Sequence, residues 1–274
     1  MPELIHEHTF RIHSYEVGPT GEARPTTLFN FLQEAAGEHA ASWGVSVPDL
    51  LPRGRTWVLS RYRLRVDRYP RLYDELTVRT WPSARGGRFA VRDFELLGSA
   101  GGAPLAVATT SWMVLDVRTG KPLPIEEFVP ARFVLPRRAL EDPFDSLPKL
   151  DAAERELTFR VMVRDLDMNR HVNNAVYVQW ALEAAPPEVH ERARPIDIEI
   201  SYRAMAYHGE EIVSRLARAG SPVAAGGSTS AGAAANAAAQ GDAVFLHQVA
   251  NAATGVELAR ARSTWREHDA GVMP

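Results

Sequence analysis

The feature that most constrains the fold of this chain is an internal repeat between its two halves. Residues 10–36 align without a gap over residues 159–185, at an offset of 149 positions, and five of the 27 pairs are identical. The identical pairs are Phe10 and Phe159, Arg11 and Arg160, Glu34 and Glu183, Ala35 and Ala184, and Ala36 and Ala185. Self-similarity of this kind predicts two structural units of one type within the 274 residues.

Each copy of the repeat leads from a helix pattern into several strand patterns. Helices are expected over residues 26–43 and 174–185, and the second follows a strand expected over residues 157–163. Alternation of apolar and polar side chains predicts the remaining strands. They are expected at residues 61–67, 75–81, 89–97 and 105–115 in the first half and at residues 196–203, 211–216, 243–249 and 256–265 in the second.

Both helix patterns carry an apolar arc wider than a surface helix needs, which is typical of a helix enclosed by other structure. A curved antiparallel sheet wrapped around one long helix, the hotdog fold, satisfies this requirement. We therefore expect an α+β chain of two tandem hotdog domains that form a pseudo-dimer. The expected N-terminal domain spans residues 1–128, a proline-rich linker spans 129–156, and the C-terminal domain spans 157–267 with an Ala/Gly-rich insertion at 220–241.

Composition excludes several classes of function. Cysteine is absent, which rules out disulfides, thiolate metal ligands and a catalytic thiol. The formal net charge of −3 gives no reason to expect a nucleic-acid partner. No apolar run approaches the ~20 residues that span a bilayer, and the first residues lack the regions of a signal peptide. We expect a cytoplasmic protein with no membrane partner.

Three polar side chains lie between the strand expected over residues 157–163 and the helix expected over residues 174–185. They are Asp167, Asn169 and His171. Either Asn173 or Asn174 can cap the helix that follows. A helix N-terminus offers backbone N–H groups that can stabilise an oxyanion. A carboxylate and an imidazole beside it can activate water, and a carboxamide can orient it. These groups suffice for metal-free hydrolysis of an ester or thioester.

A purely structural interpretation of this motif is also open, because Asp and Asn commonly close loops through their own backbone. The internal repeat bears on the choice. The residues equivalent to Asp167, Asn169 and His171 in the first half are Gly18, Thr20 and Glu22. If the polar groups served only the turn, the first half would be expected to keep them, so we expect one specialised half.

The residues around this motif resemble the fatty acyl-ACP thioesterases of plastids and bacteria. The resemblance is carried by residues 165–177 (DLDMNRHVNNAVY) and, in the first half, by residues 29–36, 57–61, 68–70, 80–81 and 111–116. It implies a double hotdog that hydrolyses long-chain acyl thioesters on acyl carrier protein (ACP) without a cofactor. It also implies that Asp167, Asn169 and His171 are catalytic and that the first half holds the acyl chain.

One departure from the family pattern concerns a second-half strand. Plant members carry a Glu and then a Cys after a Tyr-Arg pair, whereas here Tyr202 and Arg203 lead to Ala204 and Met205. The activation of water would then fall to Asp167, to His171 or to a carboxylate from elsewhere, such as Glu199. The substrate-binding residues expected are Asn173, Asn174, Trp57 and Met205, although Trp57 and the other aromatic residues are also typical of an ordinary core.

Two further groups of residues are candidates for binding. Arginines are concentrated in the first half, and they indicate either a docking patch for acidic ACP or an ordinary solvated face. They are Arg61, Arg63, Arg65, Arg68, Arg71, Arg85, Arg88, Arg92, Arg132, Arg137 and Arg138. The histidines His6 and His8 share a strand face, but no carboxylate is spaced with them, so no metal site is expected.

The sequence therefore predicts an acyl-ACP thioesterase that releases free fatty acid and the thiol carrier. The alternatives are an acyl-CoA thioesterase of the hotdog superfamily and a non-catalytic acyl-thioester-binding protein, the latter made plausible by Met205. Hotdog hydratases and dehydratases use other Asp/His or His/Glu spacings, which are not found here. The chain is expected to act as a monomeric pseudo-dimer or as a homodimer.

Overall fold

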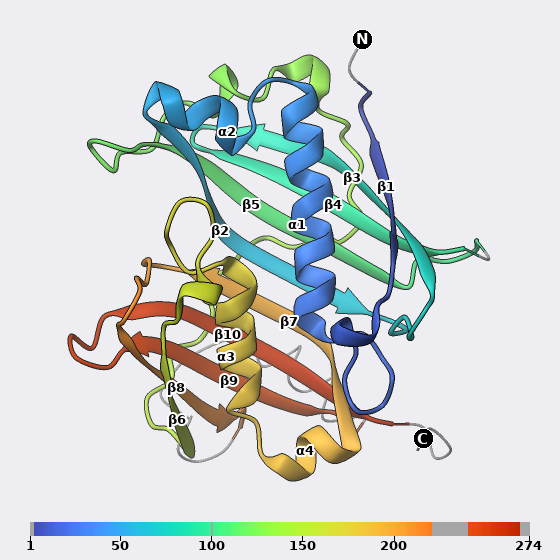
Figure 1. Cartoon of the computed structure of the whole chain (residues 1–274), viewed down its shortest axis with the longest axis vertical. Coiled ribbons are helices and arrows are strands. Elements are labelled where there is room, and N and C mark those ends of the chain that lie inside the picture. Colours follow the sequence, from blue (N-terminus) through green and yellow to red (C-terminus); the bar gives the residue numbers. More distant parts are fainter. Residues whose placement is uncertain (1–2, 100, 221–240, 269–274) are drawn as a thin grey trace. The chain divides into compact units, whose positions relative to one another are not determined.

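The computed structural model describes residues 3–99, 101–220 and 241–268 (Figure 1). The chain divides into two compact units that meet in sequence at Pro143 and Phe144. The insertion expected at residues 220–241 lies, except for its two end residues, outside the described residues.

The N-terminal unit consists of a five-stranded antiparallel sheet and one long helix. Its strands are β1 (His6–Arg11), β2 (Arg55–Val66), β3 (Glu75–Gly86), β4 (Phe89–Gly98) and β5 (Ala106–Asp116), in the sheet order β1-β3-β4-β5-β2. The helices are α1 (Pro25–Ser42) and the short α2 (Val47–Leu50). Helix α1 lies against one face of the sheet and contacts β1 and β3 (Figure 1).

The C-terminal unit repeats this arrangement. Its strands are β6 (Arg155–Arg160), β7 (Ala193–Tyr202), β8 (Glu211–Arg218), β9 (Ala243–Asn251) and β10 (Glu257–Glu267), in the order β6-β8-β9-β10-β7. The helices are α3 (Asn174–Glu183) and α4 (Pro187–Arg192), and α3 packs on β8, β9 and β10. One strand order around one enclosed helix in each unit confirms the predicted pair of hotdog folds.

The start and end of α1 follow from its sequence. Pro25 occupies the first helical position, where its missing N–H needs no partner and its fixed φ suits a helix. The helix ends at Ser42, and Gly44 shortly after it has a φ of 70°, the left-handed conformation that terminates helices. Between these ends the helix buries Leu28, Phe29, Phe31 and Leu32 among other residues, which explains its wide apolar arc.

The two units also match in detail. Phe10 of β1 pairs with Leu76, and the repeat-related Phe159 of β6 pairs with Ile212. In the last strand of each sheet a tryptophan indole N–H donates to a hydroxyl two residues earlier, from Trp112 to Thr110 and from Trp265 to Ser263, at 2.8 Å in both cases. The duplication predicted from the sequence is therefore present in the hydrogen-bonding pattern.

The prediction that a strand runs over residues 157–163 is wrong at its end. Strand β6 stops at Arg160, and Val163–Asp165 form a 3-10 turn that the Asp165 carboxylate closes by accepting the Met162 N–H at 2.8 Å. Val163 continues the alternation in the sequence but is 71% exposed, because the chain has already left the sheet. The remaining 3-10 turns are Ser14–Glu16, Leu51–Arg53, Ile125–Glu127 and Ala131–Phe133.

None of the helices in the described part of the chain is long and apolar enough to cross a lipid bilayer.

Candidate active site

The candidate site is the turn between β6 and α3, which three backbone hydrogen bonds define. The Asp167 N–H donates to the His171 carbonyl at 2.8 Å, and the Arg170 N–H donates to the Asp167 carbonyl at 3.0 Å. The Asn173 N–H donates to the Asp165 carbonyl at 2.8 Å and brings the chain to the start of α3. The turn therefore places Asp167, Asn169 and His171 directly before a helix N-terminus.

The equivalent turn of the N-terminal unit has the same backbone bonds. The Gly18 N–H donates to Glu22 at 2.8 Å, the Gly21 N–H to Gly18 at 3.0 Å, and the Arg24 N–H to Glu16 at 2.9 Å. An isolated β-bridge closes each turn, between Val17 and Ala23 in one and between Leu166 and Val172 in the other. The backbone adopts this path without an aspartate, an asparagine or a histidine, so the polar trio is not a requirement of the turn.

Asp167 organises the side chains of the turn. Its Oδ1 accepts the Asn169 N–H at 2.8 Å and the His171 N–H at 3.3 Å. Its Oδ2 receives only a long contact of 3.4 Å from Asn169 Nδ2 among the described residues. One carboxylate oxygen is thus held by the backbone, and the other retains lone pairs for a water molecule.

Asn169 retains an unused polar atom, and the His171 ring has an aromatic neighbour. The carboxamide oxygen of Asn169 is buried without a hydrogen-bond partner in the described part of the chain. A buried acceptor without a partner is unusual in a folded protein and calls for an explanation. The half-buried His171 ring packs edge-on against Tyr207, with centroids 5.3 Å apart, and this contact orients the imidazole.

The helix start differs from the sequence expectation in one respect. Asn173 is the N-cap, and its Oδ1 accepts the Ala175 N–H at 3.0 Å while its carbonyl accepts the Val176 N–H at 3.0 Å. Two of the first N–H groups of α3 are therefore bound within the protein. The prediction that Asn173 or Asn174 caps the helix is confirmed for Asn173, while these two N–H groups are not open to an oxyanion.

The segment after β7 faces the turn and carries Met205. The Ala206 carbonyl accepts the Val172 N–H at 3.1 Å, and the Ala206 N–H donates to the Tyr177 hydroxyl at 2.8 Å. Burial raises the pKa of Tyr177, and the nearby negative charges of Glu210 and Asp167 raise it further. These bonds bring the half-buried Met205 beside the turn and the first turn of α3.

Asn174 is the first residue of α3, and its carbonyl accepts a hydrogen bond from the Tyr202 hydroxyl at 3.0 Å. Tyr202 ends β7, so this bond ties the last residue of the strand to the start of the helix. Burial raises the pKa of the Tyr202 phenol, which keeps it a neutral donor.

Two other candidate carboxylates have structural partners. Glu199 is buried and pairs with Arg262 at 2.8 Å. Glu210, which the sequence reasoning missed, accepts the Tyr207 N–H at 3.0 Å. Its counterpart in the first unit is Asp74, which accepts the Arg71 N–H at 2.8 Å.

The comparison of the units thus isolates Asp167. Within residues 161–173 and 204–210 the carboxylates are Asp165, Asp167 and Glu210. Asp165 corresponds to Glu16, and both carboxylates accept a backbone N–H three residues earlier, from Met162 and His13, at 2.8 Å. Of these three carboxylates, only Asp167 corresponds to a residue without a carboxylate in the N-terminal unit, which is Gly18.

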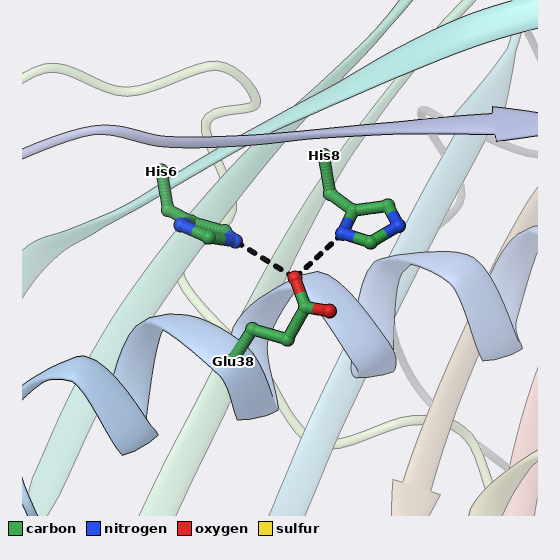
Figure 2. A group of neighbouring side chains, drawn as sticks. All are labelled: His6, His8 and Glu38. Carbon is green, nitrogen blue, oxygen red and sulfur yellow. Dashed lines mark hydrogen bonds and ion pairs between the residues drawn. The ribbon is translucent and has the colours of Figure 1, made fainter.

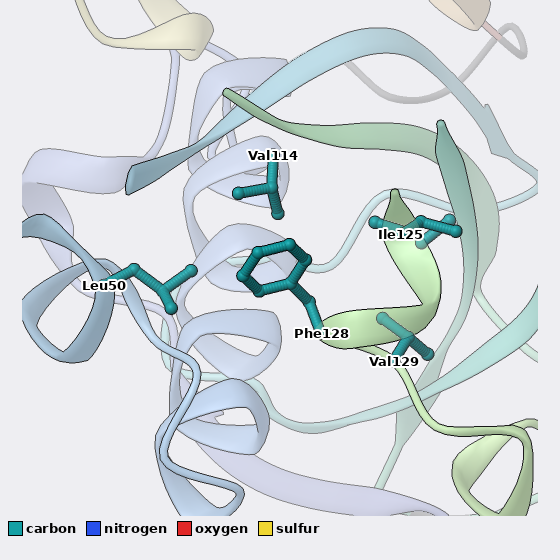
Figure 3. Packing of buried hydrophobic residues seen from close by; sticks show 6 residues of the cluster. Leu50, Val114, Ile125, Phe128 and Val129 are labelled. Carbon is teal, nitrogen blue, oxygen red and sulfur yellow. The ribbon is translucent and has the colours of Figure 1, made fainter. Parts of the chain in front are cut away.

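Trp57 lies in the N-terminal unit, away from the turn in sequence. Its indole N–H donates to the Val45 carbonyl at 2.6 Å. It packs against an apolar cluster of Leu50, Ala90, Val114, Ile125, Phe128 and Val129. Figure 3 shows this cluster. Trp57 is thus a partly buried residue that packs on the core of that unit, and its role in substrate binding remains a prediction.

Several of the arginines considered as a docking patch form ion pairs inside the N-terminal unit. Arg138 pairs with the fully buried Asp93 at 2.9 Å, and Arg137 contacts both Glu95 and the ring of Trp81. Arg61 is itself buried. These contacts indicate that some of the arginines stabilise the unit. They argue against a docking patch formed by all of them.

Comparison with known proteins decides the family. The model of the acyl-ACP thioesterase N-terminal domain matches residues 3–133, and that of the acyl-ACP thioesterase C-terminal domain matches residues 149–267. The chain belongs to the acyl-ACP thioesterase family. The resemblance inferred from the sequence motifs is therefore confirmed.

Individual relatives of this family support the assignment. The chloroplastic acyl-(acyl-carrier-protein) hydrolase FATB2 of Cuphea viscosissima is 29% identical over 98% of this chain and 64% of the relative. The palmitoyl-acyl carrier protein thioesterase of Gossypium hirsutum is 33% identical over 73% of this chain and 52% of the relative. The chain thus spans about half to two thirds of the length of these relatives.

Solved structures agree with the fold. The 12:0-ACP thioesterase from Umbellularia californica superimposes with a TM-score of 0.81 at 27% identity, covering 98% of this chain and 96% of that one. An acyl-ACP thioesterase from Bacteroides thetaiotaomicron gives a TM-score of 0.77 at 22% identity, covering 96% and 98%. These members of the thioesterase family share the double-hotdog fold with this chain.

Proposed function

We propose that the chain hydrolyses fatty acyl thioesters carried by acyl carrier protein, yielding a free fatty acid and the thiol form of the carrier. The turn before α3 in the C-terminal unit is the reaction centre, and the N-terminal unit holds the acyl chain. Membership of the acyl-ACP thioesterase family and the names of its relatives support the choice of carrier.

The observation that carries the proposal is the pair of matched turns. Two turns with the same backbone hydrogen bonds differ in whether they carry Asp167, Asn169 and His171 or Gly18, Thr20 and Glu22. Groups that the turn does not need for folding, one of them with an unpartnered buried oxygen, are best explained by chemistry.

The residues have separate roles in the proposed reaction. Asp167 accepts a proton from water through its Oδ2, and the oxygen of that water attacks the thioester carbonyl carbon. Asn169 orients the water through its unpartnered carboxamide oxygen. The C–S bond then breaks, and His171 carries the proton from Asp167 to the departing thiolate, which restores the Asp167 carboxylate. Direct attack by Asp167 on the carbonyl is the alternative first step.

A thiol-release assay with an acyl chain-length series on both ACP and CoA tests the proposal. We expect release from acyl-ACP, and a loss of about 10²–10⁴-fold in kcat for Asp167→Asn and for His171→Ala. Asp167→Asn retains an Oδ1 acceptor for the Asn169 and His171 N–H groups, so its Tm should stay close to that of the wild type. Wild-type rates in both variants would refute the assignment.

The same assay separates the other candidate functions. Equal or faster release from CoA thioesters would indicate an acyl-CoA thioesterase. Binding of acyl-ACP without thiol release would indicate a non-catalytic acyl-binding protein, for which Met205 at the position of the family glutamate is the supporting observation. A modified acyl chain that stays attached to its carrier would indicate a lyase.

A further inference from the structure

Three ligand-type side chains meet between β1 and α1 of the N-terminal unit. His6 and His8 project from the same face of the strand toward Glu38 of the helix (Figure 2). His6 Nε2 lies 3.0 Å and His8 Nδ1 2.6 Å from the same oxygen, Glu38 Oε2. The expectation that no carboxylate accompanies His6 and His8 is therefore wrong.

The geometry of this group suits a metal ion. The two imidazole nitrogens and the carboxylate oxygen all lie within 4.8 Å of one another. Bonds of about 2.0–2.1 Å in a tetrahedral zinc site place ligand atoms on the order of 3.3 Å apart, so adjustments of less than about 1 Å would suffice. The three side chains are 25–35% exposed, which leaves an approach for the ion and for a water ligand.

Neighbouring rings hold the two imidazoles in place. His6 stacks on His39 with centroids 5.4 Å apart, and His8 packs on Phe10 at 4.3 Å. His39 is not available as a fourth ligand, because its Nε2 bonds the Glu3 carbonyl and its Nδ1 faces Arg92.

We propose that His6, His8 and Glu38 bind a divalent first-row transition-metal ion, with zinc as the best match. Two imidazoles and a carboxylate form a ligand set used for zinc, whereas magnesium and calcium prefer all-oxygen sites. Three protein ligands leave one position for water. The ion joins the edge strand β1 to α1 and thereby stabilises the N-terminal unit.

This site is independent of the proposed reaction centre. At the offset of the repeat, β6 carries Arg155 and Leu157 where β1 carries His6 and His8. Helix α3 ends at Glu183, before it reaches a position equivalent to Glu38, so the described part of the C-terminal unit lacks this set of ligands. The N-terminal unit thus carries a feature that its duplicate does not.

Titration of the full metal-stripped chain with zinc tests the proposal. Calorimetry should give one ion per chain, and Tm should rise by roughly 5 °C or more when free zinc reaches 100 times the Kd. Cobalt(II) provides a second measurement, because its visible absorption reports coordination by imidazole and carboxylate. His6→Gln, His8→Gln and Glu38→Gln should each weaken binding by at least about 100-fold, since loss of an outer partner alone costs 10–100-fold.

His13→Gln is the matched control. His13 is an exposed imidazole whose Nδ1 lies 3.0 Å from the Glu16 carboxylate, but it has no second histidine. This variant should bind zinc like the wild type. Circular dichroism without metal should show that all variants fold, and their rates of thiol release without metal should match the wild type.

Two results would overturn the proposal. One is a wild-type chain that takes up no zinc at a free concentration of about 0.1 mM, which would leave the group as a hydrogen-bonded His–Glu–His cluster. The other is zinc binding that all three ligand variants retain at full affinity. Neither result bears on thioester hydrolysis, which the residues of the C-terminal turn would perform.

Discussion

Arg170 and Gly21 occupy the same position in the two turns, and both have a left-handed backbone, with φ angles of 61° and 73°. A residue with a Cβ is strained in this conformation by about 1–2 kcal/mol, whereas glycine is not. The turn that carries the proposed reaction centre is therefore the strained one, and strain of this kind is concentrated at functional sites.

Replacement of Arg170 by glycine should remove this strain. We expect Arg170→Gly to raise the free energy of unfolding by roughly 0.5–1 kcal/mol, because the gain exceeds the entropic cost of a glycine. Urea denaturation measures this change in the free energy of unfolding. The reciprocal Gly21→Arg variant should lose about 1–2 kcal/mol, although no atom outside its chain neighbours lies within 4 Å of an added Cβ. Stability changes of the opposite sign would show that φ does not control these positions.

Asn169 and Thr20 form a second matched pair. Asn169→Ala should reduce kcat for thiol release by about 10²-fold or more, because the carboxamide that orients the attacking water is lost. Thr20→Ala truncates the equivalent residue of the N-terminal turn and should leave the rate unchanged. The assay is thiol release at saturating acyl-ACP. Equal losses in the two variants would indicate a general effect on folding and contradict the assignment.

Tyr177 supports the segment that faces the turn. Tyr177→Phe leaves the Ala206 N–H without its partner, and a buried unpaired N–H costs about 1–3 kcal/mol. We expect a matching loss of stability and a lower kcat, because the Met205 segment loosens beside Asp167. Tyr202→Phe should have a smaller effect, since the Asn174 carbonyl can still accept within the helix. Thermal unfolding of both variants decides between these expectations.

His247 should make stability depend on pH. It is fully buried on β9 and bonds Ser263 at 2.7 Å, and burial lowers its pKa from 6.5 to about 4. Between these values the unfolded chain binds a proton that the folded chain excludes. The free energy of unfolding is therefore unaffected by His247 above pH 6.5, and His247 lowers it by about 3 kcal/mol as the pH drops to 4.

The measurement is the free energy of unfolding at several values between pH 7 and pH 4. His247→Gln should flatten the curve in this window, whereas replacement of the exposed His13 by Gln should not. A curve with the same slope in the His247 variant would show that other groups control the acid response.

Much of the fold could be predicted from the sequence, because the repeat and the alternation of apolar residues are local signals. The offset of 149 carries Phe10 onto Phe159, and these residues hold the same register position in β1 and β6. Element ends were less predictable. Val163 continues the alternation but is turned away from the sheet by Asp165, a side-chain to backbone bond that periodicity does not encode.

The candidate site was predictable in part for the same reason. Asp167, Asn169 and His171 lie close together in the sequence, so one turn brings them together. The contact of His171 with Tyr207 and the convergence of Glu38 on His6 and His8 depend on segments 30 or more residues apart. Spacing along the chain does not reveal such contacts, because tertiary packing creates them.

The matched turns have a consequence for design. Among the described residues, an added Cβ at Gly18 would meet one atom within 4 Å, the Glu22 carbonyl oxygen at 3.9 Å, so the backbone there has room for a Cβ. The N-terminal turn could therefore accept a transplanted trio through Gly18→Asp, Thr20→Asn and Glu22→His. A duplicated scaffold that folds with or without its reactive groups leaves evolution, or an engineer, free to choose which copy performs the chemistry.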